Sequence, residues 1–355
     1  MKGRLRVAAS LAVTAFFLWL ALHEVKWPEV WAHLRNANWL YLALSILVAT
    51  LSIHVRALRW KSLLAPLDPD VPFQPRVAGT AVGFAANNLI PARVGEFVRA
   101  LVCGKLARLP VSSVFATLVV ERVFDGLITV ALLFTVMALP GFPSPEKAAN
   151  ALNAVRFLSL LIAVMGVVVI VLALTPARSL ALAERIAGRL LPPRVGRPLL
   201  KVFESFIGGL AVLRDPRLLA VSTGWAILQW LFIPLSIYFG CLAFGITEPG
   251  YRGALFLQCV INLAVAIPSS PGFFGPLEAA AVYGLGLWGV DESRAASFAI
   301  GYHLGGFISV TLLGLWYVQK LDLSWKELVG SAGSAEANPP GASTAPAADT
   351  GRRRA

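Results

Sequence analysis

An otherwise apolar chain places three charged side chains in one short run, V-V-E-R-V-F-D-G, within a long hydrophobic segment. Glu121 and Asp125 are four residues apart and share one face of a helix, while Arg122 and Asp125 are three apart and can also meet. Inside lipid each charge would cost about 2.5–3.5 kcal/mol, so such groups pair with one another or line a polar cavity. The run therefore predicts ion pairs inside a membrane.

A second polar run, G-F-A-A-N-N-L-I-P-A-R-V-G-E-F-V-R-A, lies at residues 83–100 and contains Asn88. Six ionic groups of the two runs have charges that sum to zero: Arg93, Glu96, Arg99, Glu121, Arg122 and Asp125. One interpretation is a structural salt-bridge cluster. The interpretation that we favour is that the cluster also receives an anionic headgroup, because the planar fork of arginine holds a phosphate through two bonds.

Composition indicates the elements that must position these groups. Hydrophobic residues make up 57% of the 355 residues and charged residues 14%, with a mean hydropathy of +0.72. Soluble domains are far less apolar, so we predict a polytopic helical membrane protein. The net charge of +12 is typical of basic cytoplasmic loops rather than of nucleic-acid binding. The three cysteines are widely spaced, and we expect them to be inert.

Six apolar runs are long enough to cross a bilayer, for which roughly 20 residues suffice. The first is favoured as an uncleaved helix over a cleaved signal peptide, because no small-x-small cleavage pattern follows it. The runs are residues 1–22, 39–58, 113–139, 155–174, 218–244 and 295–318.

Two further apolar regions, residues 77–109 and 253–289, are interrupted near their middle. Each limb has about 15 residues, or roughly 22 Å of helix, which is too short to span alone. We therefore predict two re-entrant helical hairpins, whose irregular tips must be buried in protein or line a cavity. The predicted break and hinge residues are Pro91, Gly95, Pro268, Pro271, Gly272 and Gly275.

The distribution of basic residues predicts the orientation. Lys2, Arg4 and Arg6 precede the first run, Arg56, Arg59 and Lys61 follow the second, and seven basic residues lie between positions 175 and 214. The positive-inside rule then gives cytoplasmic N- and C-termini. Residues 179–213 alternate apolar and basic positions and predict two amphipathic helices on the anionic inner leaflet, with a solvated loop as the alternative. The Gly/Ser/Ala/Pro-rich residues 324–355 predict a disordered cytoplasmic tail.

The same order of elements occurs twice. Residues 1–150 and 151–323 each give three spanning helices and one hairpin, and the second set starts on the opposite side. The two breaks share letters, I-P-A-R-V-G and I-P-S-S-P-G, and each is followed by a glutamate, Glu96 or Glu278. We therefore predict an all-α fold built as an inverted repeat, a known transporter architecture with its binding site at the repeat interface.

Three ordered blocks, N-N-L-I-P-A-R-V-G-E-F-V-R-A, E-R-V-F-D and I-P-S-S-P-G-F-F-G-P-L-E-A-A, resemble the lysylphosphatidylglycerol synthase transmembrane-region family of flippase-like membrane proteins. The resemblance covers roughly residues 5–320. It implies a bacterial inner-membrane protein of about eight hydrophobic segments that moves lipids between leaflets. It carries over the six break and hinge residues named above and the residues that we predict to bind the substrate, which are Asn88, Arg93, Glu96, Arg99, Glu121, Arg122, Asp125 and Glu278. The cytosolic aminoacyl-transfer domain of the synthases is not expected here, because only the short tail follows Leu323.

The function that we predict is therefore a flippase or scramblase for an anionic or phosphate-bearing lipid. A small-solute secondary transporter and an intramembrane lipid-modifying enzyme are the alternatives. We expect no enzymatic activity, cofactor or metal, because the sequence contains no phosphate loop, nucleophile elbow or zinc-binding histidine pair. For the isolated Gln229 and His303, hydrogen bonding between helices is favoured over proton relay.

Overall fold

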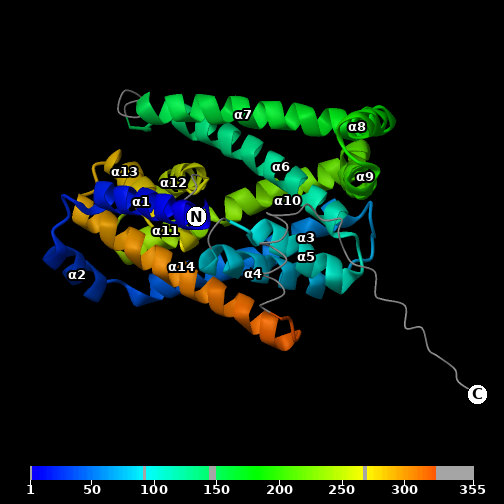
Figure 1. Cartoon of the computed structure of the whole chain (residues 1–355). Coiled ribbons are helices and arrows are strands. Elements are labelled where there is room, and N and C mark those ends of the chain that lie inside the picture. Colours follow the sequence, from blue (N-terminus) through cyan, green and yellow to red (C-terminus); the bar gives the residue numbers. More distant parts are fainter. Residues whose placement is uncertain (1, 91–92, 144–148, 267–269, 325–355) are drawn as a thin grey trace, which may run out of the picture.

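The computed structural model describes residues 2–90, 93–143, 149–266 and 270–324, with side chains from residue 12 onward except at 149–159. Helices form every regular element in these ranges, and no strand occurs in them. Figure 1 shows their arrangement. The helices are α1 (Lys2–Leu22), α2 (Trp27–Arg35), α3 (Trp39–Leu64), α4 (Phe73–Leu89), α5 (Gly95–Ala107), α6 (Val111–Ala138), α7 (Ala149–Leu174), α8 (Pro176–Leu190), α9 (Pro193–Gly209), η2 (Leu210–Arg214), α10 (Pro216–Phe232), α11 (Pro234–Ala243), α12 (Gly250–Ala264), η3 (Pro271–Phe273), α13 (Pro276–Gly286) and α14 (Glu292–Lys320).

Several of these helices are long and apolar enough to cross a membrane. Among the described residues, α3, α10 together with α11, and α14 meet this condition by length and composition. Residues 160–174 of α7 and α8 meet it jointly, but the chain bends by 100° between them. The prediction of an all-helical, polytopic membrane protein is thus confirmed at this level. The predicted break residues Pro91 and Pro268, and the predicted tail after Ser324, lie outside the described residues.

Helix α3 is longer than predicted, and this corrects one inference. It continues to Leu64 rather than ending near residue 58, so Arg56, Arg59 and Lys61 are helical and not part of a loop. Arg59 is fully buried. A guanidinium can remain inside the apolar bundle because a carboxylate from another helix pairs with it, as described below.

Two smaller differences concern short helices. The predicted segment 218–244 forms α10 and α11, which meet at Ile233 directly before Pro234, a residue that lacks the backbone N–H needed to continue a helical ladder. Helix α2 was not predicted, although Pro28 stands at its start, where proline is favoured.

The region predicted as the first hairpin consists of two antiparallel helices, α4 and α5, in close contact. A Cβ added at Gly83 would lie 2.7 Å from the Gly95 carbonyl oxygen, and one added at Gly79 would lie 3.0 Å from the Arg99 carbonyl oxygen. The missing side chains let the two backbones touch, as small residues do between membrane helices.

The second hairpin, α12 and α13, is also antiparallel. A Cβ at Gly284 would lie 2.6 Å from the Leu257 side chain, and one at Gly253 would lie 3.6 Å from the Trp288 ring. In Figure 1 this pair lies at one end of the bundle, whereas α4 and α5 lie toward the other end. The two hairpins therefore approach the middle of the bundle from opposite ends.

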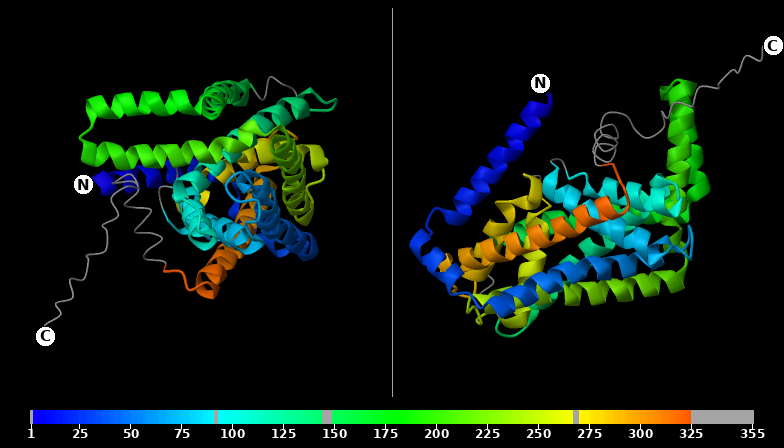
Figure 2. Two further views of the ribbon diagram at one scale, coloured as in Figure 1. Left: turned by 90° about the vertical axis from the view of Figure 1, so that its right-hand side faces the viewer. Right: turned by 90° about the horizontal axis from the view of Figure 1, so that it is seen from below.

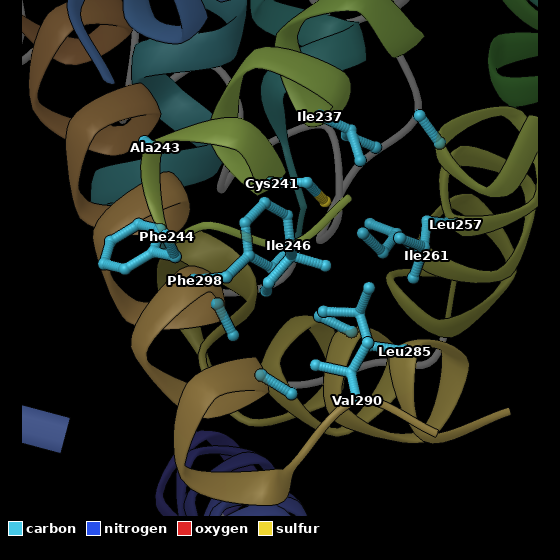
Figure 3. Close-up of a cluster of buried hydrophobic side chains, with 14 of the residues drawn as sticks. Ile237, Cys241, Ala243, Phe244, Ile246, Leu257, Ile261, Leu285, Val290 and Phe298 are labelled. Carbon is cyan, nitrogen blue, oxygen red and sulfur yellow. The ribbon is translucent and has the colours of Figure 1, made fainter. Parts of the chain in front are cut away.

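A large apolar core surrounds the second hairpin. Figure 3 shows Ile237 and Cys241 of α11, Leu257 of α12 and Phe298 of α14 pointing toward one another. All four are nearly inaccessible to solvent. Phe298 also stacks on Tyr302, with ring centroids 5.4 Å apart. This packing joins α11, α12, α13 and α14 into one unit.

Helices α8 and α9 form an antiparallel pair that lies across one end of the bundle (Figure 2). The pair is attached to the start of α6, since the Ser113 hydroxyl donates to the Ser205 carbonyl over 2.7 Å. A Cβ on Gly209 would lie 2.2 Å from the Ser113 carbonyl oxygen, so this contact requires glycine. The pair is therefore held at a fixed position beside α6.

The contact between α4 and α5 generates a stability prediction. Gly83→Ala should destabilise the fold by about 1–3 kcal/mol, because the added methyl overlaps the Gly95 carbonyl and the Arg99 side chain. Gly224→Ala on α10 is the matched control, since nothing lies within 4 Å of its Cβ position. Thermal unfolding in detergent measures both. An unfolding temperature for Gly83→Ala equal to that of Gly224→Ala would contradict the contact.

Candidate functional site

An ionic cluster lies where α3, α5, α6 and α10 meet inside the bundle. It brings together charged groups from three separate parts of the chain: Arg56 and Arg59 of α3, Glu96 and Arg99 of α5, and Glu121, Arg122 and Asp125 of α6. Gln229 and Trp230 of α10 add polar contacts. We refer to these nine residues as the ionic cluster.

Glu121 is the acceptor at the centre of one half of the cluster. Its two carboxylate oxygens accept hydrogen bonds from Nη1 and Nη2 of Arg99 at 2.7 and 3.0 Å. Arg122 donates to the same carboxylate over 2.7 Å. The guanidinium of Arg99 also lies over the Trp60 ring, 4.2 Å from its centroid. This two-point arginine–carboxylate pair is the strong geometry for a buried charge.

Asp125, one turn further along α6, organises the other half. Its Oδ1 accepts from Nη1 of Arg59 at 2.5 Å and from the Trp230 indole at 3.1 Å. Oδ2 faces Arg122 at 3.5 Å and Arg56 at 3.9 Å. Because of their four-residue spacing, Glu121 pairs with Arg99 of α5 and Asp125 pairs with Arg59 of α3.

Accessibility increases from the centre of the cluster to one edge. The side chains of Arg59 and Glu121 are 0% exposed and that of Arg99 is 1% exposed. Glu96 and Arg122 are 31% and 36% exposed. They are linked by a longer ion pair of 3.7 Å. The cluster is therefore buried at one side and reachable at the other.

Several donors of the cluster lack an acceptor. Among the described residues, six buried nitrogen atoms of the ionic cluster make no hydrogen bond: Nη1 of Arg56, Nε and Nη2 of Arg59, Nε of Arg99, Nε of Arg122 and Nε2 of Gln229. One buried acceptor of the cluster, Oε2 of Glu96, also makes none, so donors without a hydrogen bond outnumber acceptors six to one. Buried polar groups are normally satisfied, so a concentration of unpaired donors indicates a place where a further acceptor can bind.

The net charge of the cluster also favours binding of an acceptor, in this case a negatively charged one. Its four arginines face three carboxylates, which leaves one positive charge. In an apolar bundle an uncompensated charge is costly, and an anion would remove that cost. The arrangement is suited to holding a singly charged anion with several oxygen atoms.

Arg93 lies apart from this cluster. It follows α4 in the left-handed conformation, with φ of 56°, and its guanidinium donates to the Ala266 carbonyl over 2.7 Å and to the Val265 carbonyl. It also lies over the Phe273 ring, 4.9 Å from the centroid. Arg93 therefore links the tip of the first hairpin to the end of α12 and to the second hairpin. Its predicted contact with a headgroup stays a prediction.

Glu278 is also distant from the ionic cluster in the chain, and it has a partner of its own. Its Oε1 lies 2.5 Å from Nδ1 of His303 on α14, and its Oε2 accepts from the Gly275 N–H at 2.6 Å. His303 thus joins two helices, α13 and α14, through a polar contact, as the sequence favoured for it.

The remaining predicted residues have local roles. Asn88 donates to the Thr311 hydroxyl over 2.8 Å and thereby ties α4 to α14. Gly95 lies against Gly83, and its N–H donates to Asn87 over 2.8 Å. Pro271 begins η3. Gly272 and Gly275 have φ of 74° and 95°, values that favour glycine, so both glycines shape this turn.

Sequence analysis missed Arg56, Arg59, Gln229 and Trp230 as members of the cluster. A signal for the two arginines existed, because they are three residues apart in a run that continues the apolar segment of α3. Their basic character was instead attributed to a loop. Gln229 was predicted to bond another helix, but nothing local in the sequence indicated that its Oε1 would accept from Nη1 of Arg59 over 3.4 Å.

The chain is similar to several known proteins. It is 26% identical over 244 residues to a UPF0104 membrane protein of Methanocaldococcus jannaschii, covering 67% of this chain and 95% of that protein. It is 25% identical over 301 residues to a UPF0104 membrane protein of Methanothermobacter thermautotrophicus, covering 81% and 87%. A protein of Haloferax volcanii named glycosyltransferase AglD is 26% identical over 325 residues, covering 84% of this chain and 52% of that protein. No solved structure gives a significant match.

The family comparison covers most of the chain. The model of the lysylphosphatidylglycerol synthase transmembrane region matches residues 7–314, which include both hairpins and the whole ionic cluster. The resemblance of the three sequence blocks is thereby confirmed. The chain belongs to the lysylphosphatidylglycerol synthase transmembrane-region family.

Proposed function

We propose that this protein moves an anionic, phosphate-bearing lipid between the two leaflets of the membrane, as a flippase or scramblase. The observation that carries the proposal is the ionic cluster, which combines one surplus positive charge with six buried donors that make no hydrogen bond. A lipid phosphodiester supplies one negative charge, which would neutralise the surplus positive charge, and oxygen atoms that would accept from these donors. The acyl chains would stay in the bilayer while the headgroup is held.

The exposure of the cluster supports an entry point for the headgroup at Arg122. Arg99 and Arg59 are buried and already paired with Glu121 and Asp125, so they stabilise the site. Arg122 is the most exposed charged side chain of the cluster, at 36%. A headgroup that approaches from lipid would meet Arg122 first and then the unpaired donors behind it.

The two hairpins supply an element that could move. We infer that the halves 1–150 and 151–323 form the inverted repeat and that both hairpins are re-entrant. The antiparallel limbs support this, since α13 has 11 residues, or about 16 Å of helix, and cannot span. Rocking of one half against the other would then expose the ionic cluster alternately to each leaflet.

The orientation that we propose has both termini in the cytoplasm, in the inner or plasma membrane. Helices α8 and α9 support it, because they lie across the end of the bundle (Figure 2) and combine basic and apolar residues. Such helices bind an anionic leaflet through both properties. The lipid substrate and this leaflet are the partners that we propose.

Transport is favoured over enzymatic activity. Arginine partners stabilise the ionised form of Glu121 and Asp125, which suits binding of charge rather than proton donation to a substrate. A relative with an enzymatic name, glycosyltransferase AglD, is matched over 52% of its length. A small-solute transporter is the second candidate, since an inverted repeat would serve it equally.

The transport prediction concerns Arg122. In liposomes the purified protein should accelerate the movement of fluorescent phosphatidylglycerol across the bilayer, measured by quenching of the outer-leaflet probe. Arg122→Gln should slow it at least tenfold, because the surplus charge of the cluster disappears. Arg294→Gln is the control, since Arg294 pairs with Glu248 away from the cluster. Wild-type protein inactive on a panel of phospholipids and polyisoprenyl phosphates would favour the solute transporter instead.

The stability prediction separates the two sides of the cluster. Glu121→Gln leaves the buried guanidinium of Arg99 without its carboxylate and should cost about 3–5 kcal/mol. Glu96→Gln should cost much less, because Glu96 is 31% exposed and its ion pairs measure 3.7 and 3.9 Å. Thermal unfolding in detergent compares the two variants. Equal losses would show that the buried pair has no special structural role.

The orientation has its own test by cysteine labelling in whole cells with a membrane-impermeant reagent. Thr247→Cys, at an exposed position between α11 and α12, should be labelled, and Ala181→Cys on α8 should not. The native Cys103, Cys241 and Cys259 are buried and give little background. If only the Ala181→Cys variant were labelled, the proposed orientation would be wrong and the opposite one correct.

A further inference from the structure

Glu278 and His303 form a buried pair that the proposed lipid site does not use. Their side chains are 4% and 7% exposed, and Nδ1 of His303 lies 2.5 Å from Oε1 of Glu278. The other ring nitrogen, Nε2, lies 2.7 Å from the Gly272 carbonyl oxygen. The Phe274 ring covers the imidazole, with centroids 4.5 Å apart. Both nitrogens of one histidine therefore face oxygen atoms in an apolar setting.

Counting protons shows what this geometry requires. A carbonyl oxygen only accepts, so Nε2 carries a proton and donates to Gly272. A second proton must lie between Nδ1 and Oε1, whichever of the two atoms holds it. A neutral imidazole with an ionised carboxylate has one proton in total. Two hydrogen bonds at these positions therefore require one proton more than that, and without it Nδ1 and Oε1 would be two acceptors facing each other.

The pair holds a turn that is conformationally strained. Between Ser270 and Pro276 three residues have positive φ: Gly272 at 74°, Phe273 at 64° and Gly275 at 95°. The pair holds this turn at two points, because His303 donates to Gly272 and Glu278 accepts from Gly275. Phe273, a residue that rarely adopts this conformation, lies between them. Loss of the additional proton would weaken this hold on the turn.

The same turn contacts the first hairpin. The Phe273 ring lies under the guanidinium of Arg93, which also donates to the Ala266 carbonyl at the end of α12. A shift of this turn would therefore reach Arg93, which lies three residues before Glu96 of the ionic cluster. The link between the hairpins depends on a turn that the proton stabilises.

Few other charges approach the pair. Among the described residues neither Glu278 nor His303 forms another ion pair, and the described side chains of α1, residues 12–22, include no ionisable group. The charged group that lies nearest to this turn, Arg93, donates to the Ala266 and Val265 carbonyls. Ionisable groups on α14 and the helices packed against it also contact other partners, among them Tyr302 with Ser236, Arg294 with Glu248, Lys320 with Trp316, Glu29 with Lys26, Arg35 with Trp31, His54 with Phe73, Arg76 with Pro72 and Ala57, Tyr251 with Leu231 and Arg252 with Pro140. The additional proton is therefore governed mainly by the pair itself.

From this geometry we propose that Glu278 and His303 form a proton-binding site that couples lipid movement to a transmembrane proton gradient. The inference rests on the proposed lipid transport and adds its driving ion. One proton binds per cycle between Nδ1 and Oε1 and leaves when the turn from Ser270 to Pro276 opens.

The first experiment uses liposomes with a pH difference across the membrane and the electrical potential held at zero. One pH unit should shift the distribution of fluorescent phosphatidylglycerol up to about tenfold for one proton per lipid, and reversing the difference should reverse the shift. His303→Gln and Glu278→Gln should abolish this response. His54→Gln is the control and should keep it, because His54 stacks on Phe73 and has no carboxylate partner among the described residues.

Transport without a response to pH, or an equal response in wild type and both variants, would overturn the proton coupling and leave lipid transport standing.

The second experiment is independent of transport. Nitrogen-15 NMR of histidine-labelled protein, assigned with His303→Gln, should show Nδ1 sharing a proton that is lost in one step as the pH rises. Glu278→Gln should remove that signal. An imidazole that titrates identically in wild type and Glu278→Gln would exclude the site. If wild-type protein moves no lipid, the proposed function fails, and the NMR result then decides on the proton site alone.

Discussion

The need to compensate charge inside an apolar bundle determines how four helices meet. Glu121 and Asp125 stand one turn apart on α6, and each accepts from an arginine of a different neighbour, Arg99 of α5 or Arg59 of α3. An unpaired charge at this depth would cost several kcal/mol, so the helices cannot shift independently without exposing one. The small residues at the contact of α4 with α5 have the complementary effect, since they allow the backbone approach that brings Arg99 to Glu121. Packing and electrostatics thus favour the same arrangement.

Several features followed from the sequence because they have local signatures. Proline and glycine interrupt the two hairpins, and glutamate and aspartate at a four-residue spacing mark the buried face of α6. The end of α3 was predicted wrongly because basic residues after an apolar run are usually interfacial. Arg59 departs from that pattern since Asp125, 66 residues away, neutralises it. A single sequence contains no local trace of such a distant partner.

The pair of Glu278 and His303 illustrates the same limit at the second hairpin. Each residue looks isolated in its own helix, and 25 positions separate them. Their contact arises because α13 returns along α14 after the turn at Gly272 and Gly275, where positive φ reverses the chain. Sequence alone could predict that the chain turns there. It could not predict which side chain the turn would bring against which helix.

The attachment of α9 to α6 fixes a depth. Helix α9 is bonded to α6 at Ser113, near the helix start, and Glu121 follows eight residues later, about 12 Å along the axis. If α9 lies at the level of the headgroups, the ionic cluster is less than halfway through a hydrocarbon core of about 30 Å. The position of α8 and α9 then determines the depth of the ionic cluster in the membrane. They hold the cluster at one distance from the interface, so that a headgroup reaching it has covered only the first part of its path across the bilayer.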